Sequence, residues 1–527
     1  MMLFVINSRK LSDVGIYFLL VCSLSLAFLI GCQGSHETEE ANRASDKTYS
    51  PLNQGSKNDL NNALQTFNSE IQTNPRNSDG YIGRALIYLR DTNTYGDAVR
   101  DAETAISIDP ELADPYVIRA AAMVDMGHSD LYSTPRSSGN AMSDLWLLGI
   151  RERHEKAITD IGKALELEPG RPDAYFIRAH AFMDLHRSTE SIRDFDSVLQ
   201  SEPSLYLRVM TLVHRSQAHR QLGNAELAVH DASMAMELLP GLKEAYENIP
   251  KLINWHGDNF GPNKIKATAY VNRGLAYDVQ GSKQLAIRDY SSAIEYDRTY
   301  LEAYINRATT YTSIGLYEEA LSDAEQAIGS HRFIVNGSNT GLAEAYNTRA
   351  MAHFGLGNIE RGLSDVSQAI TIDGNFARAY SNRSYMYTSI KELDLAIIDA
   401  SKAIELDPDL ATAYANRAEA HLRSNNLSKA VEDSSSALSR DSSLVGARVS
   451  RAISYLGMEE YNAAFEDANI VLTQIADYPE ALFVRGASHL WITGGEKGHE
   501  DLRKVVELSN SKSLVEAAGS MLSFYDK

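Results

Sequence analysis

Residues 380–413 read YSNRSYMYTSIKELDLAIIDASKAIELDPDLATA, and Tyr414 then begins the same pattern again. Tyr346, Tyr380 and Tyr414 are spaced 34 residues apart, and an Arg follows each of them three positions later. An internal period of this length is typical of proteins built from stacked supersecondary units, because one unit cannot bury its apolar face alone. The period therefore decides the fold before any single motif does.

Each copy combines two helical patterns. In the copy quoted above, Arg383 and Ser384 belong to the first pattern, and Ala396, Ala400 and Ala403 belong to the second. Small or apolar residues at spacings of three and four place one helix face against its neighbour and let two helices approach closely. The aromatic residue, the small residues and the closing Pro resemble the tetratricopeptide repeat. This resemblance implies an all-α fold, a right-handed superhelical solenoid of helix-turn-helix repeats in about eleven copies.

An Arg of the first helix and an Asp of the second helix recur in every copy. The Arg residues are Arg84, Arg119, Arg178, Arg215, Arg273, Arg307, Arg349, Arg383, Arg417, Arg451 and Arg485. The Asp residues are Asp101, Asp160, Asp194, Asp231, Asp289, Asp323, Asp365, Asp399, Asp433, Asp467 and Asp501. Their separation is 16 residues in nine copies, 17 in the first and 41 in the second, so the pair follows helix position. Because a guanidinium fork suits a carboxylate, we expect a ladder of structural ion pairs, with a charged binding stripe as the alternative.

The N-terminus has a different pattern. Residues 14–30 are almost wholly apolar and follow two basic residues, Arg9 and Lys10. This order predicts a secretory signal, and the sequence Leu29-Ile30-Gly31-Cys32 resembles the bacterial lipobox, which implies a lipid (palmitate) anchor at Cys32. The alternative is an uncleaved transmembrane anchor with a chance Cys, since the apolar run is only just long enough to span. Either interpretation tethers the repeats to a membrane outside the cytoplasm, and Gln33 favours the outer membrane and periplasm if the cell has two membranes.

Breaks in the period divide the chain into segments. They predict a lipoprotein signal peptide at 1–31, a flexible tether at 32–56, an N-terminal array at 57–240 with an insertion at 127–152, an irregular insertion at 241–264, a repeat pair at 265–328, an insertion at 329–343, a C-terminal array at 344–508 and a capping helix at 509–527. Trp146 and Trp255 lie in the first two insertions. We expect these insertions either to anchor partners through the aromatic side chains or to fold back over the helices.

The composition and motifs point away from catalysis. A formal net charge of −20 argues against a general affinity for nucleic acid, whose phosphates require a basic face. The 14 His residues contain no pair at a metal-binding spacing on one helix face, and no phosphate-binding loop or nucleophile elbow is present. The sequence therefore predicts a protein that is not an enzyme and has no cofactor and no metal.

A row of Asn residues precedes the recurrent Arg in several copies. The row consists of Asn272, Asn306, Asn382 and Asn416. The resemblance implies that this position faces a concave groove, where an asparagine ladder could bind the backbone of an extended peptide, as in some proteins of the family. The alternative is that Asn is merely tolerated on a helix surface. A carboxylate clamp is disfavoured, because Thr268, Glu302, Glu344 and Thr412 stand where a clamp needs Lys, and only Arg378 is basic.

These features lead to one functional prediction. We expect a membrane-anchored, non-catalytic scaffold or adaptor that binds extended peptides or partner proteins in a concave groove. One alternative is a structural scaffold that associates with itself as a homo-oligomer. The other alternative is a regulatory subunit whose catalytic partner is a separate chain.

Overall fold

A computed structural model describes residues 57–89, 94–133, 141–248, 262–331, 339–493 and 496–525. The predicted signal peptide, the tether and the lipidation site at Cys32 lie outside the described residues. Every regular element within the described ranges is a helix. The all-α, helix-pair fold that the period predicts is therefore confirmed.

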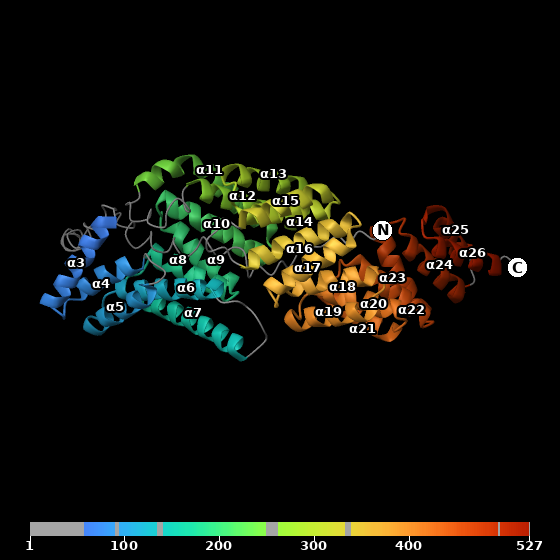
Figure 1. The fold of residues 1–527 in the computed structure, drawn as a ribbon, viewed down its shortest axis with the longest axis horizontal. Helices are drawn as coiled ribbons and strands as arrows, with labels where there is room; N and C mark the ends of the chain where they lie inside the picture. The colour runs from blue at the N-terminus through green and yellow to red at the C-terminus, as the bar shows by residue number, and fades with distance from the viewer. Residues whose placement is uncertain are drawn as a thin grey trace. The chain divides into compact units, whose positions relative to one another are not determined.

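The helices follow one another as α3 (Lys57–Thr73), α4 (Ser78–Tyr88), α5 (Tyr95–Ile108), α6 (Asp114–Ser133), α7 (Ala141–Leu167), α8 (Pro172–Asp184), α9 (Ser188–Gln200), α10 (Leu205–Gln221), α11 (Ala225–Asn248), α12 (Pro262–Val279), α13 (Lys283–Tyr296), α14 (Leu301–Ser313), α15 (Tyr317–His331), α16 (Asn339–Gly355), α17 (Ile359–Ile372), α18 (Ala377–Ser389), α19 (Leu393–Leu406), α20 (Ala411–Arg423), α21 (Leu427–Arg440), α22 (Val445–Gly457), α23 (Tyr461–Gln474), α24 (Pro479–Thr493), α25 (Glu496–Leu508) and α26 (Lys512–Tyr525). From α4 to α25, even-numbered helices are the first helices of the repeats and odd-numbered helices are the second (Figure 1).

The chain divides into two compact units. The N-terminal unit contains α3 to α14, with residues 322–331 of α15 and 339–342 of α16. The C-terminal unit contains residues 315–321, the rest of α16, and α17 to α26. Within each unit, most consecutive helices pack against each other along the chain, as a solenoid requires.

Small residues set the distance between the two helices of a repeat. In the repeat of α18 and α19, Ser384 on the first helix and Ala396, Ala400 and Ala403 on the second are fully buried. The hydroxyl of Ser384 donates to the carbonyl oxygen of Ala396 at 2.7 Å, which only a close helix approach allows. The small positions that suggested the repeat therefore form its interior.

The turn between the two helices uses a left-handed residue eight positions after the recurrent Arg. Gly223, Gly281, Gly315 and Gly357 occupy this position with φ between 76° and 82°. In four other repeats the residue is not Gly, namely His186, Lys391, Asn425 and Glu459, with φ between 57° and 68°. A left-handed residue ends the first helix, and Gly adopts this conformation without the steric cost of a Cβ atom.

Single helices close the two ends of the described array. Leu60, Ala63 and Phe67 of α3 are buried in the first core cluster, although α3 has no partner helix before it in the described residues. Leu514 and Met521 of α26 pack against the last core cluster. The first and last described helices, α3 and α26, thus each cover one end of the described array.

Parts of the predicted insertions are helical in the structure. Residues 127–133 extend α6 and residues 141–152 form the start of α7, so only 134–140 of the first insertion is undescribed. In the second insertion, residues 241–248 continue α11, which contains Pro240 within the helix. Residues 249–261, which include Trp255, lie outside the described part, as does the side chain of Trp146 on α7. In the third insertion, 329–331 belong to α15 and 339–343 to α16.

Candidate functional site

The recurrent Arg and Asp contact each other in all eleven repeats. In each pair, Nε and Nη2 of the Arg donate to Oδ2 and Oδ1 of the Asp at 2.6–2.9 Å. The Asp residues are 1–8% exposed. We call these eleven pairs the Arg–Asp ladder. Each pair joins the two helices of one repeat, including Arg349–Asp365, Arg383–Asp399 and Arg417–Asp433.

The third guanidinium nitrogen links neighbouring repeats. Nη1 of Arg383 donates to Oγ of Ser367 on α17 at 3.2 Å, and Nη1 of Arg417 donates to Oγ of Ser401 on α19 at 3.1 Å. Equivalent bonds run from Arg84, Arg215, Arg273, Arg307, Arg451 and Arg485 to Asn68, Asp196, Ser233, Ser291, Ser435 and Asn469. The acceptor stands two residues after the Asp of the preceding repeat in all of these except Asn68. This recurrent polar residue is a signal that our sequence analysis missed.

The ladder keeps its charge in the interior. The guanidinium of Arg383 lies 5.6 Å from the ring centroid of Tyr380 and 5.9 Å from that of Tyr387, one turn away on either side. The hydrogen bond with Asp399 raises the pKa of Arg383 above its usual value. A guanidinium whose nitrogens all donate to protein acceptors has few N–H donors left to bind a ligand. The geometry therefore supports the structural interpretation of the ladder over a binding stripe.

The Asn row joins consecutive first helices. Nδ2 of Asn272 on α12 donates to the carbonyl oxygen of Val213 on α10 at 3.2 Å. Nδ2 of Asn382 donates to Oδ1 of Asn347 on α16 at 2.9 Å. Nδ2 of Asn416 on α20 donates at 2.8 Å to the carbonyl oxygen of Ser381 on α18 and at 3.0 Å to its hydroxyl. In each case the acceptor residue immediately precedes the equivalent position of the earlier repeat.

The four Asn residues differ in how deeply they are buried. Asn272 is 2% exposed and Asn416 is 9% exposed, so both present little surface to a ligand. Asn306 and Asn382 are half-buried, and Nδ2 of Asn306 has no hydrogen-bond partner among the described residues. The sequence predicts this row as a peptide ladder. Two of its residues, Asn272 and Asn416, are buried and join neighbouring first helices, whereas Asn306 and Asn382 retain accessible surface.

In the C-terminal unit, a polar and aromatic cluster continues along the first helices. Oε1 of Glu419 on α20 accepts from Nε of Arg423 at 2.7 Å, and Oε2 accepts from the hydroxyl of Ser450 on α22 at 2.7 Å. The Glu419 side chain is 16% exposed, whereas that of Arg423 is 46% exposed. The Tyr385 ring on α18 contacts Phe354 on α16 edge-on at 5.1 Å between centroids. We call Asn382, Tyr385, Glu419 and Arg423 the first-helix cluster.

The charges around this cluster act on nearby phenols. Burial raises the pKa of Tyr478 to about 12, with further contributions from the charges of Glu480 and Glu419. Burial likewise raises the pKa of Tyr385, whose environment includes Glu419 and Arg423. Both phenols therefore remain protonated at neutral pH.

The positions of a carboxylate clamp are occupied differently. Nη2 of Arg378 on α18 donates to Oε1 of Glu344 on α16 at 2.8 Å. The side chains of Arg378 and Glu344 are 28% and 13% exposed. Because the basic residue is already paired with an acid, this arrangement does not favour a free carboxylate.

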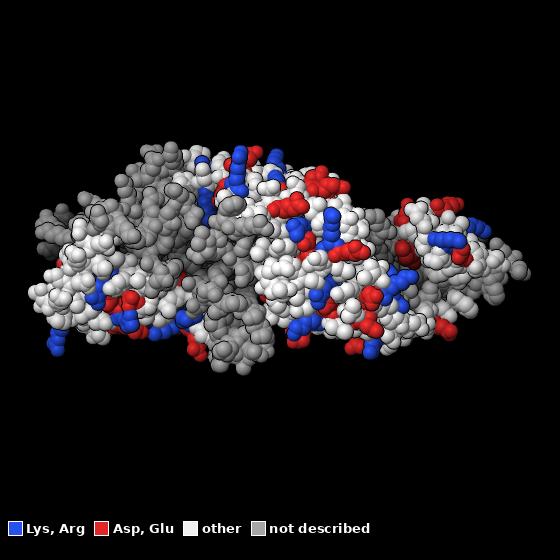
Figure 2. Space-filling model, viewed as in Figure 1, with Lys and Arg blue, Asp and Glu red and all other residues white. Residues whose placement is uncertain are grey.

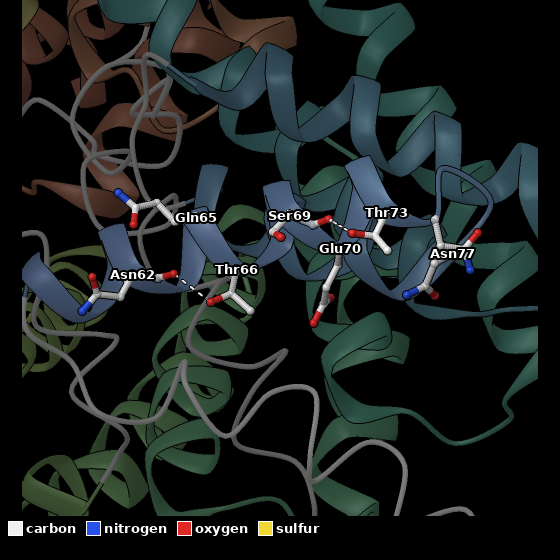
Figure 3. A pocket seen from close by; sticks show the side chains of 8 residues that line it. Asn62, Gln65, Thr66, Ser69, Glu70, Thr73 and Asn77 are labelled. Carbon is white, nitrogen blue, oxygen red and sulfur yellow. Dashed lines mark hydrogen bonds between the residues drawn. The ribbon is translucent and has the colours of Figure 1, made fainter.

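A shallow polar hollow lies along α3 (Figure 3). Its lining consists of Asn62, Gln65, Thr66, Ser69, Glu70, Thr73, Asn74 and Asn77. The hydroxyls of Thr66 and Thr73 donate to carbonyl oxygens of their own helix, at 3.0 Å and 2.8 Å. These side chains are mostly exposed, so the hollow has the character of a solvated helix face.

Buried His residues form a separate feature of the N-terminal unit. His154 on α7 is fully buried, with Nδ1 2.8 Å from the carbonyl oxygen of Ile150 and Nε2 2.8 Å from Oδ2 of Asp184 on α8. Burial lowers the pKa of His154, but the hydrogen bond and charge of Asp184 outweigh burial and place the pKa above its usual value. Burial lowers the pKa of His214 on α10 to about 4.

The described residues contain neither a metal-binding group nor a membrane-spanning helix. No group of three or more His, Cys, Asp or Glu side chains there is arranged to hold a metal ion. No described helix is both long enough and apolar enough to cross a bilayer. On the face shown in Figure 2, basic and acidic side chains are interspersed, and neither sign forms an extended field.

Comparison with known proteins identifies the repeat. A family model for the tetratricopeptide repeat matches residues 267–300, 301–330 and 377–410. The chain carries tetratricopeptide repeats. The three matched segments coincide with the repeats of Arg273, Arg307 and Arg383, which share the ladder geometry with the other eight.

The relatives share only part of the chain. Human DnaJ homolog subfamily C member 7 is 23% identical over 51% of this chain and 63% of its own length. Human tetratricopeptide repeat protein 6 is 27% identical over 30% of this chain and 32% of its own length. The chain thus spans less than two thirds of these relatives. Human serine/threonine-protein phosphatase 5 is 39% identical, over only 13% of this chain and 14% of the enzyme.

Solved structures show the same kind of similarity. A tetratricopeptide repeat protein from Parabacteroides merdae ATCC 43184 is 17% identical, covers 50% of this chain and 99% of that one, and has a TM-score of 0.35. The structure of the APC/C hetero-tetramer Cut9-Hcn1 covers 89% of this chain and 94% of that one, at 10% identity and a TM-score of 0.43.

Proposed function

We propose that the protein is a non-catalytic scaffold that binds an extended segment of a partner protein on the first helices of its C-terminal unit. The observation that carries the proposal is the first-helix cluster, where Tyr385 and Arg423 keep accessible surface while hydrogen bonds fix their neighbours. Arg423 donates to Glu419, and Glu419 also accepts a hydrogen bond from Ser450 on the next first helix, α22. A preorganised set of donors and aromatic rings loses little entropy when it binds a chain.

The cluster suits the backbone of an extended peptide. The half-buried amide of Asn382, the phenol of Tyr385 and the guanidinium of Arg423 can donate to carbonyl oxygens, while aromatic surface covers apolar side chains. These groups come from α18 and α20, two consecutive first helices that are linked by the bonds of Asn416 to Ser381. Peptide recognition through such donors depends weakly on the peptide side chains.

A displayed library of random linear peptides, selected on the full chain, tests this proposal. The affinity of a selected peptide is then compared between the natural chain and a Tyr385→Ala/Arg423→Ala variant. We expect the double variant to weaken binding at least tenfold. The matched control is Glu466→Ala on the exposed face of α23, which should leave the affinity unchanged. Equal affinity for the natural chain and both variants would contradict the proposal.

We further propose that the scaffold is anchored to a membrane outside the cytoplasm by acylation of Cys32. The support is the apolar segment at 14–30 and the four residues that end at Cys32. Metabolic labelling with an alkynyl palmitate analogue tests this proposal. We expect label in the natural chain and none in Cys32→Ala, with Cys22→Ala as the control for the other Cys. Label that persists in Cys32→Ala would refute the anchor.

A further inference from the structure

The second helix α19 exposes apolar side chains where its neighbours expose polar ones. Leu395 is 43% exposed and Ile398 is 62% exposed, the largest exposed fraction among the bulky apolar side chains of the described residues. At the same two positions of the repeat, α17 has Arg361 and Ser364, whereas α21 has Lys429 and Glu432. The exposed apolar pair therefore distinguishes α19 from its neighbours α17 and α21.

The charges on α19 are arranged in a defined order around Ile398. Asp394 lies four residues before Ile398, and Lys402 lies four residues after it. Lys391 lies seven residues before Ile398, and Glu405 lies seven residues after it. Each acid on one side thus corresponds to a base at the same spacing on the other side. These spacings place Asp394, Lys402 and Glu405 on the helix face of Ile398, whereas Lys391 lies in the turn before α19.

We propose that α19 packs antiparallel against α19 of a second copy of this chain, with the two-fold axis passing beside Ile398. In this arrangement Asp394 lies opposite Lys402 of the second copy. The two-fold axis repeats this contact, so two ion pairs flank an apolar centre. The helix dipoles oppose each other, which also favours the antiparallel orientation.

The neighbouring second helices α17 and α21 lack this self-complementary order. Around Ser364, α17 has Gly357, Glu360, Gln368 and Thr371 at the corresponding positions. Around Glu432, α21 has Asn425, Ser428, Ser436 and Ser439. Neither neighbour therefore combines an apolar centre with complementary flanking charges.

The contact between the two α19 helices is small, so the association is weak. Stable interfaces bury about 800 Å² on each partner, and one helix face with its immediate flanks provides less. Lys402 also forms an ion pair with Glu405 of its own helix at 2.6 Å, which must open or be shared when the second copy binds. The dimer is therefore weak and forms in a concentration-dependent manner.

Sedimentation equilibrium of the full chain over a range of concentrations tests the proposal. Four samples are compared with the natural chain: Ile398→Asp, Asp394→Lys, Lys402→Asp, and the double variant Asp394→Lys/Lys402→Asp. Ser364→Asp on α17 is the matched control, because it places the same new charge at the same repeat position. All substituted side chains are at least partly exposed, and circular dichroism verifies that each variant remains folded.

We expect a monomer–dimer equilibrium that Ile398→Asp weakens at least tenfold and that Ser364→Asp leaves unchanged. Each single charge variant should weaken the dimer by placing like charges opposite each other, and the double variant should restore it. A natural chain that stays monomeric at every concentration would overturn the proposal and leave a different protein as the occupant of this face. A dimer that Ile398→Asp does not weaken would overturn it as well. Neither result bears on the first-helix cluster, which lies on other helices.

Discussion

The Arg383–Asp399 pair offers a quantitative test of what holds a repeat together. Asp399 is 5% exposed and accepts two hydrogen bonds from Arg383, at 2.6 and 2.9 Å, while Arg383 also bonds Ser367 of the preceding repeat. Replacing Arg383 by Met removes all three bonds and leaves a buried carboxylate without its cation. Breaking a buried ion pair from one side costs about 3 to 5 kcal/mol of folding free energy.

A double-mutant cycle isolates the pair from its surroundings. Arg383→Met and Asp399→Leu each leave one unpaired charge, whereas the double variant leaves none and should cost clearly less than the sum of the two. The assay is urea unfolding together with hydrogen exchange of the amides in α18 and α19, because a repeat array can open locally. Lys163→Met is the control, since Lys163 and Glu166 form an exposed pair at 3.8 Å, whose loss should cost less than about 1 kcal/mol. If the two single losses simply add, the pair is not coupled and the reasoning is refuted.

Three further predictions follow from backbone conformation, packing and protonation. Glu459→Gly should raise the free energy of unfolding by about 0.5 to 1 kcal/mol in a urea titration, because φ at Glu459 is 64° and Gly adopts it without strain; a loss of stability would contradict this. Gly83→Ala should destabilise α3 and α4 by about 1 to 3 kcal/mol, since the new Cβ atom would lie 2.3 Å from the Phe67 ring; unchanged hydrogen exchange in α3 would contradict the packing. His214 has a pKa of about 4 in the folded chain and about 6.5 when unfolded, so the unfolded chain binds the proton first and stability falls as the pH drops from 6.5 towards 4. His214→Phe should reduce this acid sensitivity by up to about 3 kcal/mol, and an unaltered pH profile would show that another group is responsible.

The sequence predicts the repeat interior because the interior uses the same residue types in every copy. The small residues at the positions of Ala396, Ala400 and Ala403 recur, as does the Arg–Asp pair at the positions of Arg383 and Asp399. The interior of one copy therefore predicts the interior of the next. The lateral bond to Ser367 also recurs, but Ser is common in polar helix surfaces and its role is recognisable only from the packing of neighbouring repeats. Periodicity therefore predicts contacts within a repeat better than contacts between repeats.

The insertions and the Asn row show where sequence reasoning is weaker. Residues 127–133 and 141–152 lack the repeat signature, yet they continue α6 and α7, because a helix can extend beyond its repeat without any tertiary template. The Asn residues share one sequence position, but burial differs among them: Asn272 is 2% exposed, and Asn382 is half-buried. Such differences arise from the residues of the preceding first helix, which the recurrent pattern does not specify.

The central functional claim is that partners bind on the first helices of the C-terminal unit. Site-specific photo-crosslinking in cells that produce the protein tests this claim most directly. A photoreactive amino acid is placed at Tyr385 on α18 in one sample and at Glu466 on α23 in another. The account predicts a crosslinked partner from position 385 and none from position 466. A partner crosslinked at position 466 but not at position 385 would contradict it.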